Sequence, residues 1–307
     1  MVKFFKVILI ASSIFLSVLF GISSGYFQHF PFALVYKILN GRDVSGNNWE
    51  YRGRNYEVKQ PILTPIKVTP RSGVYLTYGQ SNSANSGELG YTVENEVYQF
   101  ILGSTFSYED PSVGATGLGG SVWGMVGDEL ISRGVHDRVI FANSGWGGRK
   151  IEELKMGPIF DFLILNYITA KNTYGKVDAI LFHQGESDNN ADGVLNYYGH
   201  FSEFLSNLDA RGVKAPVYLS RASFCSDRHP VNIELTDVQD RLISEYGVVH
   251  AGPNTDLLVS TKERSSDNCH FSLVGNRAFA KLWADAIQSN YSSPSKRERD
   301  GVTHFDH

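Results

Sequence analysis

The chain has 307 residues, of which 42% are hydrophobic and 20% are charged. This composition is that of a folded globular protein, and it excludes a disordered, collagen-like or disulfide-stapled chain. The formal net charge of −4 offers no basic excess to neutralise phosphates, so a nucleic-acid partner is not expected.

The N-terminal segment, residues 1–28, has the pattern of a membrane-targeting sequence. Lys3 and Lys6 precede an uncharged stretch whose most apolar part, residues 7–24, is at the lower limit of the length that spans a bilayer. The segment is either an uncleaved anchor or a signal peptide cleaved after Gly25. We expect the anchor, because no Ala-x-Ala pattern is present. The lysines place the N-terminus in the cytoplasm, so the rest of the chain is expected in the periplasm or outside the cell, or secreted if cleavage occurs.

Residues 29–70 show no sustained periodicity and contain four of the ten prolines, which indicates a connector. We expect one folded domain over residues 71–290. The charged stretch that follows, residues 291–307, is predicted to be a loosely held tail.

Within the domain, short apolar runs alternate with segments long enough for helices. The runs are rich in β-branched and aromatic residues, which is typical of the central strands of a parallel sheet. The expected strands are 73–78, 138–142, 177–182, 215–219 and 248–251, and the expected helices are 121–133, 151–174, 193–211, 231–246 and 272–288. This alternation predicts an α/β fold: a three-layer α/β/α sandwich around a mainly parallel five-stranded sheet.

Ser81 is a candidate nucleophile. In such sheets ligands bind at the carboxyl ends of the strands, and Ser81 follows the first strand directly, in the segment GQSN. A turn at this place exposes a hydroxyl beside backbone N–H groups, as a serine nucleophile requires. By itself the segment is equally an ordinary Gly/Ser/Asn turn, and it is not the Gly-x-Ser-x-Gly elbow.

Asp267 and His270 form a candidate base with its orienting acid. An Asp three residues ahead of a His can turn back so that its carboxylate holds the imidazole Nδ1–H, which leaves Nε2 to take a proton from serine. Alone, this spacing favours a helix cap, in which Asp267 satisfies backbone donors. In combination with Ser81 it favours a Ser-His-Asp site.

The sequence resembles the SGNH hydrolase superfamily, and within it the sialate O-acetylesterase-like branch related to carbohydrate esterase family six. The resemblance covers nearly all of residues 73–290. It rests on five blocks in order: 79–82 (GQSN), 117–121 (GLGGS), 146–148 (WGG), 183–188 (HQGESD) and 267–272 (DNCHFS). It implies the SGNH hydrolase fold, with a flavodoxin-like sheet, and the catalytic residues Ser81, Asp267 and His270.

The resemblance also implies an oxyanion hole. Its donors would be the N–H of Ser81, the N–H of Gly120 or of the neighbouring Gly119, and the side-chain amide of Gln184. Neutral donors of this kind stabilise developing negative charge without competing with the base.

Four further residues are candidate substrate contacts, and three of them have a structural alternative. They are Asn82 and Glu186 in the motif blocks, and Trp146 and Arg149 after the second strand. Glu186 is more simply an anchor that holds loops by hydrogen bonds, Trp146 a buried aromatic, and Arg149 a surface residue at a helix start.

Export would place Cys225 and Cys269 in an oxidising compartment, where we expect them to pair rather than remain two buried thiols. The sequence has no H-E-x-x-H or Cys-x-x-Cys spacing and neither nucleotide-binding glycine motif. No metal, nucleotide or other cofactor is therefore expected.

These observations and the resemblance predict a serine esterase that removes O-acetyl groups from a carbohydrate, such as sialic acid or an acetylated polysaccharide. An O-acetyltransferase would use the same Ser-His-Asp site with a sugar hydroxyl in place of water. A carbohydrate-binding domain without activity is a further alternative, although binding alone does not require all three residues.

Overall fold

The computed structural model describes residue 62 and residues 66–291. The chain divides into two units, Met1–Arg54 and Asn55–His307, and the described residues lie in the second. The predicted anchor at 1–28, most of the connector at 29–70 and nearly all of the tail at 291–307 are outside them. In the part of the chain that is described, no helix is both long enough and apolar enough to cross a membrane.

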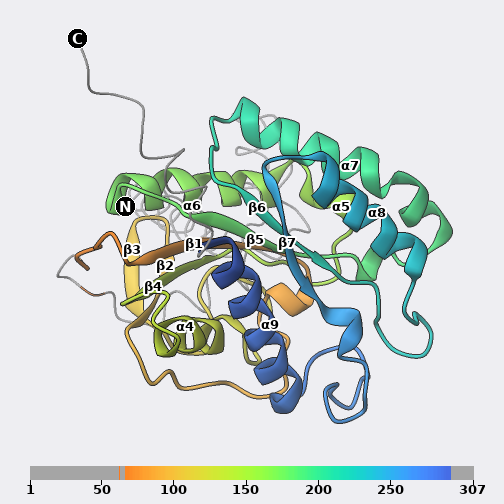
Figure 1. The fold of residues 1–307 in the computed structure, drawn as a ribbon, viewed down its shortest axis with the longest axis horizontal. Coiled ribbons are helices and arrows are strands. Elements are labelled where there is room, and N and C mark those ends of the chain that lie inside the picture. Colours follow the sequence, from red (N-terminus) through yellow and green to blue (C-terminus); the bar gives the residue numbers. More distant parts are fainter. Residues whose placement is uncertain (1–61, 63–65, 292–307) are drawn as a thin grey trace, which may run out of the picture. The chain divides into compact units, whose positions relative to one another are not determined.

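A central sheet organises the described part of the chain (Figure 1), with the strand order β3-β2-β4-β1-β5-β6-β7. Every neighbouring pair is parallel except the antiparallel pair of β2 and β3. The mainly parallel sheet that the sequence predicts is thus confirmed. The strands are β1 (Gly73–Gly79), β2 (Val97–Ile101), β3 (Ser104–Ser107), β4 (Val139–Asn143), β5 (Ala179–His183), β6 (Val217–Arg221) and β7 (Val249–Asn254).

Helices cover both faces of this sheet. In Figure 1, α4 and α9 lie on one face, and α5, α6, α7 and α8 lie on the other. The helices are α4 (Trp123–Ser132), α5 (Ile151–Leu154), α6 (Pro158–Tyr174), α7 (Ala191–Ala210), α8 (Ile233–Glu245) and α9 (Leu273–Tyr291). The predicted three-layer α/β/α sandwich is therefore confirmed.

Strand β1 shows how the two hydrophobic cores form. Val74, Leu76 and Tyr78 belong to the core under α5 to α8, whereas Tyr75 belongs to the core under α4 and α9. Successive side chains of a strand point to opposite faces, so one fully buried strand supplies both cores. A strand covered on both faces is expected to be mainly apolar, as this one is apart from Thr77.

The sheet has seven strands, and the prediction of five was wrong. Strands β2 and β3 form a hairpin that turns at Leu102 and Gly103, whose φ angles are 46° and 95°. Two positive φ angles are typical of the tight turn in a hairpin, but Asn-Gly is the usual sequence for it. The Leu-Gly pair is a weaker signal for such a turn, so the hairpin is not predicted from the sequence.

The predicted helix over 151–174 is two helices. Gly157 has a φ of +88°, outside the helical region, and Pro158 is the first residue of α6. Proline is favoured at the first position of a helix because it lacks the N–H group that would be unpaired there. The Gly-Pro pair therefore separates α5 from α6.

Strand register brings three loops to one edge of the sheet. Strand β1 pairs with β4 on one side and with β5 on the other. Thr77 lies opposite Asn143, and Gly79 lies opposite His183. The residues that follow these strands therefore emerge beside one another at the carboxyl edge, where ligands bind in such folds.

Candidate functional site

Ser81 begins a single 3₁₀ turn, Ser81–Ser83, immediately after β1. The turn passes close to β5, because a Cβ atom on Gly79 would lie 1.9 Å from the carbonyl oxygen of His183. With its φ of +135°, only glycine fits at residue 79. The close approach holds Ser81 at the strand end, where the residue is 8% exposed. Among the described residues, neither its Oγ nor its N–H has a hydrogen-bond partner.

The candidate base and its orienting acid meet in the loop before α9. His270 Nδ1 lies 2.5 Å from Asp267 Oδ2. The other carboxylate oxygen accepts the backbone N–H groups of Cys269 and His270, both at 2.9 Å. A carboxylate oxygen can only accept, so Nδ1 carries the proton and Nε2 has its lone pair available.

Asp267 is held as a carboxylate by the same contacts. Burial raises its pKa, but the N–H groups of Cys269 and His270 and the imidazole lower it by more. The resulting pKa is well below the ordinary value of an aspartate. Asp267 therefore keeps its negative charge beside the imidazole, as an orienting acid must.

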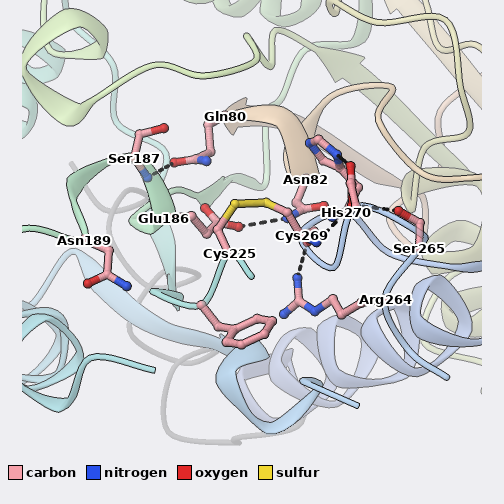
Figure 2. The surroundings of a disulfide bond; sticks show 12 residues. Gln80, Asn82, Glu186, Ser187, Asn189, Cys225, Arg264, Ser265, Cys269 and His270 are labelled. Atoms are coloured by element: carbon pink, nitrogen blue, oxygen red, sulfur yellow. Dashed lines mark hydrogen bonds and ion pairs between the residues drawn. A yellow bond between two sulfur atoms is a disulfide. The ribbon is translucent and has the colours of Figure 1, made fainter. Parts of the chain in front are cut away.

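The nucleophile turn and the base loop are in contact. Asn82 Nδ2, one residue from Ser81, donates to the carbonyl of Cys269 at 3.5 Å, and Cys269 precedes His270 (Figure 2). The N–H of Glu88 donates to the carbonyl of Phe271 at 3.0 Å. No hydrogen bond joins Ser81 Oγ to the imidazole in the described structure. Catalytic hydrogen bonds are often long without substrate, so the two loops lie where a substrate could complete this pair.

Glu186 contacts the Ser81 turn through a buried hydrogen bond. Its side chain is buried and its Oε1 accepts from Asn82 Nδ2 at 2.9 Å and lies 3.0 Å from His183 Nε2. Burial raises the pKa of Glu186, but His183 and Asn82 lower it to about 2. A carboxylate that is 5% exposed and binds two neighbouring side chains through Oε1 matches the predicted anchor role.

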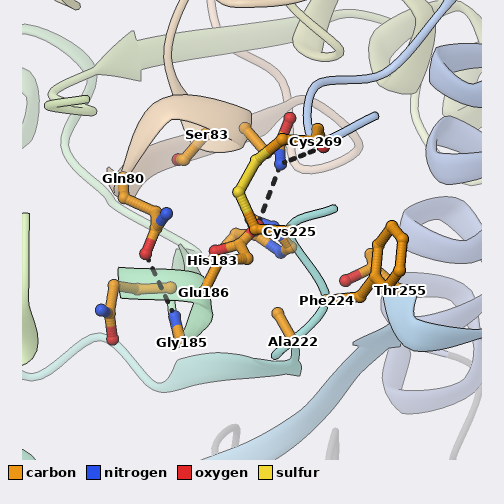
Figure 3. A network of polar contacts seen from close by, with 12 residues as sticks. Gln80, Ser83, His183, Gly185, Glu186, Ala222, Phe224, Cys225, Thr255 and Cys269 are labelled. Carbon is orange, nitrogen blue, oxygen red and sulfur yellow. Dashed lines mark hydrogen bonds and ion pairs between the residues drawn. A yellow bond between two sulfur atoms is a disulfide. The ribbon is translucent and has the colours of Figure 1, made fainter. Parts of the chain in front are cut away.

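Gln80 adds a second tie between the same blocks. Its Oε1 accepts the N–H of Ser187 at 3.0 Å (Figure 2) and the N–H of Gly185 at 3.4 Å (Figure 3). Two side chains of the GQSN segment thus hold the loop after β5. The sequence alone does not predict this role of Gln80.

The proposed oxyanion glycine requires correction. The N–H of Gly120 donates to the carbonyl of Gly87, and the N–H of Gly119 donates to the carbonyl of Asn85, both at 2.9 Å. Both donors are therefore occupied by the backbone of another loop. Neither Gly119 nor Gly120 can hold an oxyanion in this structure.

The side-chain amide of Gln184 is also occupied. Its Nε2 donates to Asp188 Oδ2 at 2.5 Å and to the carbonyl of Arg149 at 3.2 Å, and the residue is fully buried. An amide nitrogen has two hydrogens, so no donor remains for a substrate. We therefore correct the expected oxyanion role of Gln184 to one of bracing the loops after β4 and β5.

The glycine beside Ser81 is instead Gly147. A Cβ atom built on Gly147 would lie 3.8 Å from Ser81 Cβ, in ordinary contact. The N–H of Gly147 donates to Thr116 Oγ1 at 2.8 Å, whereas that of Gly148 has no partner among the described residues. The Trp-Gly-Gly block is one of the five motif blocks of the sequence. It lies beside Ser81 because β4, which it follows, pairs in parallel with β1.

The other candidate substrate contacts are largely inaccessible. Asn82 is 5% exposed and committed to Glu186, and Trp146 is 2% exposed and offers no open face for a sugar. Arg149 is half-buried and forms an ion pair with Glu153 at 2.6 Å. Its placement matches the surface alternative.

Cys225 and Cys269 form a disulfide. The bond joins the loop after β6 to the residue next to His270, as Figure 2 shows. It thereby ties the base loop to the neighbouring strand end.

Among the described residues, no group of three His, Cys, Asp or Glu side chains is arranged to hold a metal ion.

Comparisons with known proteins give a family and a fold. The chain matches the family described as carbohydrate esterase, sialic acid-specific acetylesterase over residues 126–289, just over half of its length. A comparison with curated protein sequences found no match. A protein from Arabidopsis thaliana has a TM-score of 0.58 at 15% identity, with 73% of this chain and 100% of that chain covered. At this identity the likeness shows the fold alone.

Two esterases of known structure are less similar. A carbohydrate acetylesterase from Xanthomonas citri has a TM-score of 0.48 at 15% identity, with 70% of this chain and 55% of that chain covered. A carbohydrate esterase family 3 protein from Talaromyces cellulolyticus has a TM-score of 0.48 at 12% identity, with 71% and 98% covered.

The family match contains Asp267 and His270 and begins after Ser81. It agrees with the sialate O-acetylesterase-like branch that the motif blocks resemble. The chain therefore belongs to the carbohydrate esterase family of sialic acid-specific acetylesterases.

Proposed function

We propose that this protein is a serine esterase that removes O-acetyl groups from a carbohydrate. Family membership supports acetyl ester hydrolysis. The observation that carries the mechanism is the short His270–Asp267 contact, on a loop that touches the residue next to Ser81. Sialic acid is the sugar that the family description names, and an acetylated polysaccharide is the broader class.

In the proposed reaction, Ser81 Oγ attacks the acetyl carbon while His270 Nε2 takes the serine proton. The C–O bond to the sugar then breaks, and the sugar oxygen takes that proton from His270. The acetyl group remains on Ser81 as an ester. Water attacks this ester with His270 again as base, and acetate leaves as Ser81 regains its proton.

Each attack places a negative charge on the carbonyl oxygen, and hydrogen-bond donors are needed to stabilise this oxyanion. We assign this role to the N–H groups of Ser81 and Gly148, because neither has a protein partner in the described structure and Gly148 directly follows Gly147, which lies against Ser81. Asp267 holds the imidazole in its reactive tautomer and stabilises the imidazolium that forms.

We also propose that the domain is exported and held at the membrane by residues 1–28. The basic start and apolar run of this segment support the proposal, as does the disulfide, since stable disulfides form in oxidising compartments. Recovery of the full-length protein in the soluble cytoplasmic fraction with free thiols would contradict it.

Acetate release tests the reaction. Wild-type protein, Ser81→Ala and Ser86→Ala are given an aryl acetate, O-acetylated sialic acid and acetylated xylan. Ser86 is the matched control, because its hydroxyl has no partner in the described structure and lies in the same segment. We expect Ser81→Ala to lower kcat by about 1000-fold or more, and Ser86→Ala to retain it.

Turnover retained by Ser81→Ala would reject the mechanism. Acetylation of an added sugar in place of acetate release would assign the site to an acetyltransferase. The rates of acetate release from O-acetylated sialic acid and from acetylated xylan show which of the two sugars the enzyme prefers.

A further inference from the structure

Arg264 is a buried arginine directly behind the base loop. It is 3% exposed and forms an isolated bridge with Phe271, on the other side of that loop. Its guanidinium donates to the carbonyls of Cys269 at 2.5 Å, Leu258 at 2.6 Å and Thr255 at 3.2 Å. Figure 2 shows Arg264 pointing toward Cys269. One side chain thus ties the base loop to the turn after β7.

The guanidinium lies among aromatic rings and has no carboxylate partner. Its carbon atom is 4.1 Å from the ring centre of Phe271 and 5.0 Å from that of Phe224. No acidic side chain of the described residues lies within ion-pair distance of it. Carboxylates such as those of Glu186 and Asp267 act on this charge only through space. The guanidinium instead satisfies three buried carbonyls, which an apolar side chain would leave without hydrogen-bond donors. The charged fork therefore has a use beyond filling space.

The Cys269 peptide links that fork to the catalytic pair. Its carbonyl accepts from both Arg264 and Asn82. The N–H of the same peptide group is that of His270, and it donates to Asp267 Oδ1. Rotation of this peptide would move the imidazole relative to Ser81 and would also disturb the carboxylate that orients the imidazole.

We propose that Arg264 is a positioning residue for catalysis, which fixes the Cys269 peptide so that the His270 imidazole faces Ser81. This inference rests on the proposed serine esterase mechanism. Arg264 touches neither the substrate nor the reacting atoms. A displacement of about 1 Å in such a group can lower turnover by about 100-fold, so the guanidinium controls kcat rather than substrate binding.

The test compares Arg264→Met, Arg264→Lys and Arg221→Met in the full-length protein. Arg221 is the matched control, since it also donates to a backbone carbonyl at the same sheet edge, that of Gly252, but does not touch the base loop. For each variant, kcat and KM are measured with an aryl acetate, and the fold is checked by thermal unfolding.

We expect Arg264→Met to lower kcat by about 10-fold to 100-fold with KM within about twofold of wild type. Lysine has one point charge and cannot reach three diverging carbonyls, so Arg264→Lys should recover only part of kcat. Arg221→Met should keep wild-type kcat.

Wild-type kcat in a folded Arg264→Met protein would overturn the inference. If methionine prevents folding, wild-type kcat in Arg264→Lys would overturn it equally. A uniform rise in KM without loss of kcat would also reject a positioning role. Retention of turnover by Ser81→Ala would instead reject the mechanism on which the inference rests.

Discussion

Gly147 brings the loop after β4 against the proposed nucleophile Ser81, and its lack of a side chain keeps the space beside that residue open. A Cβ atom there would lie 3.6 Å from Thr116 Oγ1 and 3.8 Å from Ser81 Cβ, which are ordinary contacts. The fold can therefore accept a methyl group at this position. The same methyl group would narrow the space beside Ser81 that the proposed reaction needs for the acetyl group.

We expect Gly147→Ala to lower kcat/KM for an aryl acetate by about 10-fold or more, since one methyl group in a pocket is worth about that factor. Gly199→Ala is the control, because its Cβ meets nothing within 4 Å on the exposed side of α7. The control should keep turnover and raise the free energy of unfolding by about 0.5–1 kcal/mol. Equal kcat/KM in both variants would show that Gly147 does not line the site of the reaction.

At the scale of elements, the site depends on loops that follow different strands and are then tied to one another. Glu186 and Gln80 join the segments after β1 and β5, and the disulfide joins the segments after β6 and before α9. Parallel strands place their carboxyl ends together, but polar contacts decide how the loops lie there.

The disulfide should therefore contribute to turnover as well as to stability. We expect Cys225→Ser/Cys269→Ser to lower the free energy of unfolding by about 2–4 kcal/mol. We also expect kcat to fall more than KM rises, because Cys269 is bonded to His270. Urea unfolding and steady-state kinetics measure the two effects. A variant with wild-type kcat would show that the bond stabilises the fold without positioning the base.

At the scale of the whole molecule, Glu186 links the site to acid stability. Its pKa is lowered from an ordinary 4.5 to about 2, so the folded state favours the carboxylate. The stabilisation is present in full above pH 4.5 and is lost as the pH falls toward 2. Wild-type protein should therefore lose stability steeply across this interval.

Glu186→Gln removes the titrating group and keeps the shape of the side chain. We expect its free energy of unfolding to be lower than that of wild type at pH 7 and to change less between pH 4.5 and pH 3. Urea unfolding at a series of pH values measures both. If the free energy of unfolding of this variant fell with pH as steeply as that of wild type, other carboxylates would cause the acid dependence.

The sequence predicted the features that depend on neighbours along the chain. Apolar runs marked five of the seven strands, and Asp267 turns back onto His270 because three residues suffice for that turn. The hairpin of β2 and β3 was missed, since Leu-Gly is an uncommon sequence for its turn. Local patterns thus identified the layers, the serine at the first strand end and the acid–base loop.

Only the tertiary structure decided which polar groups are available. Gly120 and Gln184 look like donors in the sequence, yet Gly87 and Asp188 occupy them. Arg264 looks like any charged residue near a loop, and only the fold buries it against three carbonyls. The physical reason is that a buried polar group must find its partner wherever the fold brings one, however distant in the chain. Local spacing therefore determined which residues could react, and long-range contacts determined which donors remain free for a substrate.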